Sequence, residues 1–93
     1  LNLQLISYTP GTLSHADYTS PAMKNYRSSE AILQSVSAYH NKHPSGLNGF
    51  IVLMHIGAGP ERKDKLHDVL WKLIAWMQKS GYQVVPLSEL LRQ

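Results

Sequence analysis

Residues 50–62 read Phe-Ile-Val-Leu-Met-His-Ile-Gly-Ala-Gly-Pro-Glu-Arg, FIVLMHIGAGPER, and the interpretation of the rest of the chain depends on this stretch. Its first five residues, Phe50 to Met54, are apolar and predict a strand that is buried on both faces. His55 follows this strand directly, and the glycine-rich residues after it predict a sharp turn. The stretch therefore raises a question: why should a core strand end in a residue that can carry a proton near neutral pH?

The segments around this stretch predict an alternating order of strands and helices. Two further apolar runs, residues 2–8 and 82–85, predict strands. Helices are expected over about residues 28–40 and 64–80, with a short last helix capped by Ser88. Because strands that are continuous apolar runs alternate with helices, the sequence predicts an α/β fold with about three parallel strands.

The composition excludes several classes of protein. With 43% hydrophobic and 16% charged residues the chain is globular, and no apolar run approaches the roughly 18 residues of a membrane span. The formal net charge of +3 is scattered, and only Arg62, Lys63 and Lys65 come close to a cluster. No basic stripe with stacking aromatic residues is present, so nucleic-acid binding is not expected. The absence of cysteine excludes a disulfide framework and a thiolate metal site.

The strongest candidate for chemistry is His55. In α/β folds, functional residues gather at the carboxyl ends of the strands, here at His55 and in the long loop after Tyr8. Asp17 and Tyr18 lie in that loop and could meet His55 across the top of the sheet. A carboxylate hydrogen-bonded to an imidazole orients the ring and favours its protonated form, as an acid catalyst requires. The alternatives are a structural histidine bonded to a carbonyl and an Asx-type turn at Asp17.

Two other motifs carry less information. The loop Gly57-Ala58-Gly59-Pro60 matches neither glycine-rich phosphate motif, and its proline removes an amide donor. We expect its glycines to turn the chain away from His55. His40 and His43 have a spacing that can hold a metal, but no third ligand accompanies them, so no metal site is expected within this chain.

A longer pattern runs from residue 49 to residue 91: GFIVLMHIGAGPERKDKL, a long helix, and then GYQVVPLSELL. This pattern resembles the C-terminal end of a polysaccharide deacetylase, of the NodB-homology family also called carbohydrate esterase family four. The segment LQLISYTPGTLSHADYT resembles the family's preceding strand and loop. Residues 1–93 are accordingly interpreted as the C-terminal half of a single catalytic domain, an excerpt of a longer chain, with the fold of a distorted (β/α) barrel.

The resemblance implies a metal-dependent hydrolase that removes N- or O-acetyl groups from an acetylated polysaccharide or oligosaccharide such as chitin, peptidoglycan or xylan. His55 fits the family's Leu-x-His motif as the general acid, and Leu53 fits the residue that lines the pocket for the acetyl methyl group. Asp17 and Tyr18 match the family's Asp-Trp pair, in which the aspartate orients the histidine and the aromatic ring forms a wall of the pocket. Tyr18 stands where the family has Trp, and Ile56 stands where many members have Asp.

The family's catalytic base and metal ligands lie in earlier motifs, an Asp-Asp pair and a His-[Ser/Thr]-x-x-His, and neither motif occurs in this chain. A divalent metal, zinc, is therefore expected only in the full-length domain, and the chain alone is expected to bind none and to be inactive. Export to the periplasm or the cell surface is implied by the family's substrates.

Two expectations remain for the chain by itself. Three parallel strands without the rest of a barrel leave unpaired edges, so self-association through exposed sheet edges is expected. The rival interpretation is a non-catalytic α/β interaction module in which His55 is structural, and a flavodoxin-like or phosphatase-like fragment is a third.

Overall fold

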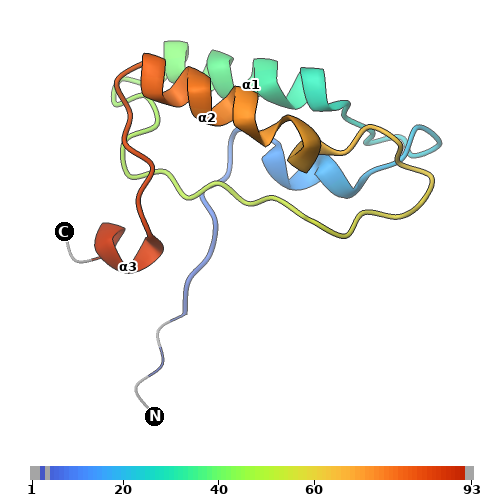
Figure 1. Ribbon diagram of the computed structural model, residues 1–93, viewed down its shortest axis with the longest axis horizontal. Helices are drawn as coiled ribbons and strands as arrows, with labels where there is room; N and C mark the ends of the chain where they lie inside the picture. Colours follow the sequence, from blue (N-terminus) through green and yellow to red (C-terminus); the bar gives the residue numbers. More distant parts are fainter. Residues whose placement is uncertain (1–2, 4, 92–93) are drawn as a thin grey trace.

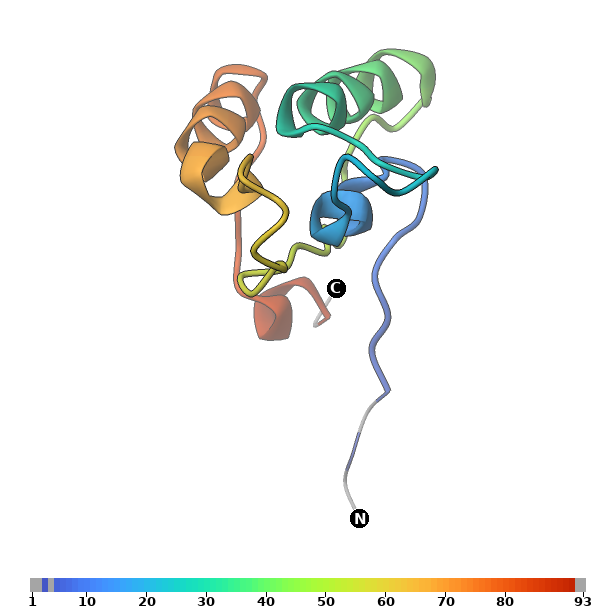
Figure 2. The same cartoon turned by 90° about the vertical axis from the view of Figure 1, so that its right-hand side faces the viewer.

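The computed structural model describes residues 3 and 5–91. Two α-helices, α1 (Ser29–Lys42) and α2 (Leu70–Lys79), lie side by side and run in the same direction (Figure 1). The shorter helical segments of the described chain are two 3-10 helices, η1 (Ser14–Tyr18) and η2 (Leu66–Val69), and a last turn, α3 (Leu87–Leu90). The helix η1 packs beneath α1, and η2 leads directly into α2 (Figure 2).

No β-strand is present among the described residues, so the predicted α/β fold, with about three parallel strands of a distorted (β/α) barrel, is wrong for this structure. The described residues of the three apolar runs have no regular structure, and the first run extends away from the helices (Figure 1). Where the first two runs meet, the Thr9 amide donates to the Ile51 carbonyl at 2.9 Å, and the Thr9 hydroxyl accepts from the Ile51 amide at 2.9 Å. A strand requires a row of such main-chain bonds to a neighbour, and one contact does not make a ladder. Residues 2 and 4 of the first expected strand lie outside the described residues.

The helix α1 begins where the sequence predicts. Ser28 has extended backbone angles, and its hydroxyl accepts a hydrogen bond from the Ala31 amide at 3.1 Å, the usual arrangement of an N-cap. Ile32 and Val36, one turn apart, are both fully buried. The predicted first helix is therefore confirmed, and it extends to Lys42.

The second predicted helix is confirmed with a later start. Asp64 does not begin it; instead, the Asp64 carboxylate accepts from the Ser29 amide at 2.6 Å, at the start of α1. At the other end Gly81 has a positive φ of 92°, and the Tyr82 amide donates to the Met77 carbonyl at 2.9 Å. This is the C-terminal stop that the glycine predicts.

The last helix differs in its cap. Ser88 lies inside α3, and Pro86 occupies the N-cap position without a side-chain hydrogen bond. Residues 92 and 93, which the sequence assigned to this helix, lie outside the described residues. In the part of the chain that the structure describes, no helix has the length and hydropathy needed to cross a membrane.

The core is a small cluster between α1 and α2. Its buried members are Val36, Leu47 and Leu73, and partly buried apolar side chains surround them. The Tyr82 hydroxyl closes one end of this cluster, because it accepts from the Leu47 amide at 2.8 Å and hydrogen-bonds the His40 ring. Residue 82 is thereby tied to two positions more than 30 residues earlier, His40 near the end of α1 and Leu47 just after it.

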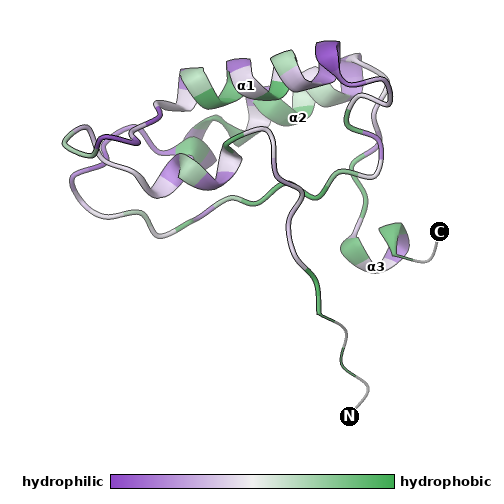
Figure 3. Ribbon diagram, turned by 180° about the vertical axis from the view of Figure 1, so that it is seen from behind, coloured by the Kyte–Doolittle hydropathy of each residue, from purple (hydrophilic) through white to green (hydrophobic). Residues whose placement is uncertain are grey.

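Apolar surface continues beyond this core. A cavity of about 510 Å³ lies between α2, residues 50–54 and residues 82–90, and most of its lining residues are hydrophobic. In Figure 3 hydrophobic residues lie along residues 50–54, which run beneath the helices, and again in α3. Leu5 and Ile56 are among the most exposed apolar side chains, at 98% and 85%. Because the described residues form no sheet, they offer no sheet edge; self-association stays a prediction that would now rest on this apolar surface.

Candidate functional site

The structure brings Asp17 and His55 together across 38 residues of sequence. One carboxylate oxygen of Asp17 lies 2.6 Å from the His55 ring nitrogen Nδ1, and the other accepts from the His55 backbone amide at 2.6 Å. The Asp17 side chain is 1% exposed, whereas the His55 side chain is 41% exposed. A buried carboxylate is stable only when its oxygens are satisfied, and here both oxygens are used by the same residue.

The turn η1 is what aims Asp17 inward. Leu13, just before η1, has a left-handed backbone with φ of 61°, and its carbonyl accepts from the Ala16 amide at 3.0 Å. At the other end, both the amide and the hydroxyl of Thr19 donate to the Ala16 carbonyl, at 3.0 and 2.7 Å. This short turn buries Ala16 and Asp17, so the Asp17 side chain leaves the polar loop and points at His55. The alternative of a local Asx-type turn is not what forms here.

The geometry fixes which nitrogen of His55 is available for chemistry. Because a carboxylate only accepts, Nδ1 carries the hydrogen that it donates to Asp17. The second ring nitrogen, Nε2, makes no hydrogen bond within the described residues, and the ring is partly open to solvent. Tyr18 packs edge-on against this ring, with the ring centroids 5.8 Å apart, and is itself 44% exposed. The arrangement can hold a proton on Nε2 and deliver it to a group that approaches from solvent.

The structure gives no clear place in this site to Leu53, the other residue expected to line the pocket. Leu53 is partly buried, and it does not line the 510 Å³ cavity, whose walls include its neighbours Val52 and Met54. Ile56, immediately after the histidine, is exposed. No contact of Leu53 with His55 identifies it as a wall of an acetyl pocket, and this role stays a prediction.

His40 and His43 are engaged locally. The His40 Nδ1 atom hydrogen-bonds the Tyr82 hydroxyl, and the His43 Nδ1 atom accepts from the Ser45 amide at 3.2 Å. Among the described residues, no three His, Asp or Glu side chains come together in a way that could hold a metal ion. These residues therefore do not fit a zinc site of the usual kind, which takes at least three protein ligands.

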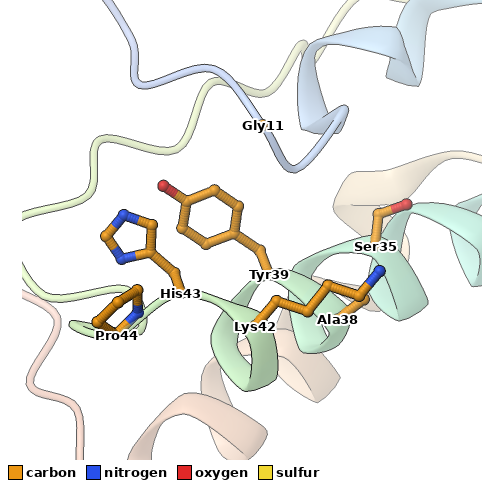
Figure 4. Close-up of a pocket in the computed structure, with 7 residues that line it drawn as sticks. All are labelled: Gly11, Ser35, Ala38, Tyr39, Lys42, His43 and Pro44. Atoms are coloured by element: carbon orange, nitrogen blue, oxygen red, sulfur yellow. The ribbon is translucent and has the colours of Figure 1, made fainter.

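A second hollow, of about 350 Å³, lies at the end of α1 beside Gly11 (Figure 4). The rings of Tyr39 and His43 stack in it, with centroids 5.1 Å apart and planes at 8°, while the Lys42 side chain runs away from them along the helix. A Cβ atom on Gly11 would lie 2.6 Å from the Tyr39 ring, so this glycine is needed for close packing. Nothing in this hollow connects it to His55.

The loop after His55 works differently from its predicted role. Neither Gly57 nor Gly59 has a left-handed backbone, so the turn does not depend on the conformational freedom of glycine. Its carbonyl groups accept hydrogen bonds, since the Lys65 ammonium donates to the Gly59 carbonyl at 2.9 Å. A phosphate cradle would need free amide donors instead.

Sequence reasoning missed Arg62, which is the largest fully buried side chain among the described residues. It donates to main-chain carbonyls of the loop that follows Asp17, namely those of Thr19 and Arg27. In the sequence Arg62 stands between Glu61 and Lys63 and looks like part of a solvated charge cluster. No signal in the charge pattern separates it from its exposed neighbours.

The chemical interpretation of this site depends on the chain's own residues. Comparison with protein-family models, curated proteins and solved structures finds no match to this chain. The resemblance of residues 49–91 to the polysaccharide deacetylases therefore stays a prediction, and so do the activity, the metal and the export that it implies.

Proposed function

We propose that this chain carries the proton-donating histidine of a carbohydrate deacetylase, a hydrolase that removes N- or O-acetyl groups from an acetylated polysaccharide or oligosaccharide. The observation that supports this proposal is the pairing of His55 with the buried Asp17 carboxylate, which accepts hydrogen bonds from the ring Nδ1 and from the backbone amide of His55. The resemblance of residues 49–91 to the polysaccharide deacetylases supplies the class of reaction.

The proposed role of each residue follows from its place in the pair. When the bond between the acyl carbon and the sugar nitrogen or oxygen breaks, the electron pair goes to the leaving atom, and His55 donates the Nε2 proton to that atom. Asp17 holds the ring in one orientation and stabilises its positive charge. Tyr18 forms one side of the space above the ring, and Leu53 is proposed to contact the acetyl methyl group.

The proposal gives the described residues only this proton-transfer step. They do not fit a metal site, so the attacking water and the divalent metal, zinc, that the resemblance implies are assigned to residues outside them. The proposed parent domain therefore extends beyond this chain. Its substrates, polymers of the cell surface or of the surrounding medium, make export part of the same proposal.

The test compares two substrates on the intact protein. Replacing a positioned general acid lowers kcat by about 10² to 10⁴ when the leaving group needs a proton. We expect His55→Ala to show this loss on an N-acetylated chitin oligosaccharide and a much smaller loss on an activated aryl acetate, whose leaving group departs without a proton. Metal content, measured by elemental analysis, should not change.

The chain offers a matched control in its second His–Asp pair. The His67 Nε2 atom lies 3.3 Å from the Asp68 carboxylate, and the His67 side chain is 38% exposed, close to the value for His55. Its carboxylate partner, however, is 66% exposed, so the pair lacks a buried anchor. His67→Ala should leave both activities unchanged. Equal losses on both substrates in His55→Ala, or metal lost together with activity, would refute the acid role and favour a structural histidine.

A further inference from the structure

We infer that Arg62 is a positioning residue for His55, because it fixes the turn that aims Asp17 at the histidine. The part of this inference that concerns catalysis rests on the proposed function, whereas the part that concerns geometry does not.

Arg62 is 0% exposed and makes no ion pair with a carboxylate in the described part of the chain. Removing a guanidinium from water without an anionic partner is costly unless its N–H groups find acceptors. A face contact with the Tyr26 ring, 5.7 Å from the centroid, compensates in part. The Nε atom nevertheless has no partner among the described residues. An apolar side chain would fill the same space without this cost, so an arginine is useful here only through the hydrogen bonds of its Nη1 and Nη2 groups.

The guanidinium group binds two main-chain carbonyls at once. The Nη1 group of Arg62 donates to the Thr19 carbonyl at 2.8 Å and to the Arg27 carbonyl at 2.8 Å. The Nη2 group lies 3.4 Å from the hydroxyl of Ser29, the first residue of α1. Arg62 therefore closes the loop between Thr19 and Arg27 at its base and fastens it to the start of α1.

The turn that carries Asp17 is connected to this clamp through Thr19. The Thr19 hydroxyl donates to the Ala16 carbonyl at 2.7 Å and accepts from the Arg27 amide at 3.1 Å. Asp17 lies between Ala16 and Thr19, so the residues on both sides of it are tied down. A shift of Thr19 would move the Asp17 carboxylate relative to His55.

Two cross-links thus join the same two segments. His55 and Arg62 are seven positions apart on one segment, and their partners, Asp17 and Thr19, are two positions apart on the other. One cross-link alone would leave the orientation of Asp17 to the packing of η1 against α1. With both in place, the orientation of Asp17 is set, and a site held this way keeps its catalytic geometry.

The geometric test is nuclear magnetic resonance of the intact protein. The His55 amide and ring Nδ1 signals report the two bonds to Asp17, and Asp17→Ala gives the values for a broken pair. Arg62→Lys keeps the charge but loses the second nitrogen, Nη2, and the fixed planar geometry in which Nη1 faces both carbonyls. We expect it to shift both His55 signals toward the Asp17→Ala values and to speed exchange of the His55 amide by about 10-fold. The methyl signals of Val36 and Leu73 should stay in place.

Arg62→Met and Lys63→Met complete the design. Arg62→Met should give the same His55 shifts as Arg62→Lys, or larger ones. Lys63→Met removes a charge from the exposed adjacent position and should leave the His55 signals unchanged. Wild-type His55 signals in both Arg62 variants would overturn the inference. Shifts of the core methyl signals together with those of His55 would also overturn it, because they would assign Arg62 to general stability.

Kinetics separate this inference from the proposed function. If both hold, Arg62→Lys lowers kcat on the chitin oligosaccharide by about 10-fold, with KM unchanged, because a misplaced acid affects the chemical step. If His55→Ala keeps full activity while Arg62→Lys still shifts the His55 signals, the proposed function fails and the positioning role stands. If His55→Ala loses activity while Arg62→Lys keeps both activity and signals, the positioning role fails and the proposed function stands.

Discussion

Replacing Asp17 should destabilise the fold more than replacing His55, although the two residues contact each other. Asp17→Ala removes both hydrogen bonds of 2.6 Å, one to a ring nitrogen and one to a backbone amide. His55→Ala removes only the ring bond, because its backbone amide still donates to the carboxylate. Hydrogen bonds to charged groups contribute about 1.5–3 kcal/mol each, so Asp17→Ala should cost about 3–6 kcal/mol. The ring is 41% exposed, which places its bond at the low end, and His55→Ala should cost about 1.5 kcal/mol.

Urea unfolding followed by circular dichroism measures this difference. A chain of 93 residues has a total stability of about 5–14 kcal/mol, so His55→Ala should stay folded at low temperature, whereas Asp17→Ala stays folded only where this total exceeds its cost. Asp17→Asn is a useful intermediate, since its amide can accept one of the two bonds but not both. If His55→Ala cost as much stability as Asp17→Ala, the backbone bond to Asp17 would contribute nothing, and our account of how η1 is held would be refuted.

Three further predictions concern the rest of the chain. Gly46→Ala should lower the stability by about 1–3 kcal/mol in thermal melts, because Gly46 has a positive φ of 57° and a Cβ there would collide with the Tyr82 hydroxyl. The control Gly49→Ala, at a φ of 74° with nothing within 4 Å of its Cβ, should cost only about 1 kcal/mol. Tyr82→Phe should cost about 1–2 kcal/mol in urea unfolding because the Leu47 amide loses its acceptor, whereas Tyr8→Phe should be near neutral. Calorimetric titration of the chain with zinc should show at most weak binding, and a tight stoichiometric site would contradict the assignment of metal ligands to other residues.

The helices could be predicted from the sequence, and the lack of strands among the described residues could not. The start of α1 is marked by Ser28, whose hydroxyl binds an amide three residues later. The end of α2 is marked by Gly81, which adopts a positive φ. Each signal depends only on residues close to it in the sequence. A strand depends on a partner elsewhere in the chain. Phe50 to Met54 have the apolar pattern of a buried strand, but apolar character alone does not supply the row of main-chain bonds.

The candidate site likewise has one part that the sequence predicts and one part that it does not. His55 and Asp17 could be proposed as partners because a carboxylate and an imidazole suggested one chemistry and both follow apolar runs expected to be parallel strands, although no strand forms among the described residues. Arg62 could not be found in this way, because its role depends on the carbonyls of Thr19 and Arg27, and main-chain carbonyls carry no residue-specific signal. A buried arginine that binds backbone looks, in a sequence, like any surface arginine.

The apolar cavity between α2, residues 50–54 and residues 82–90 affects how laboratory preparations of this chain should be judged. Its volume of about 510 Å³ could accommodate a naphthalene-type fluorescent dye, which is commonly used to detect loosely packed states. Dye fluorescence would then arise from the native arrangement, with helices α1 and α2 fully formed. A bright dye signal should not by itself lead to a preparation being discarded as misfolded. The near-ultraviolet dichroism of Trp76, whose ring packs against those of His40 and Tyr82, is the better criterion.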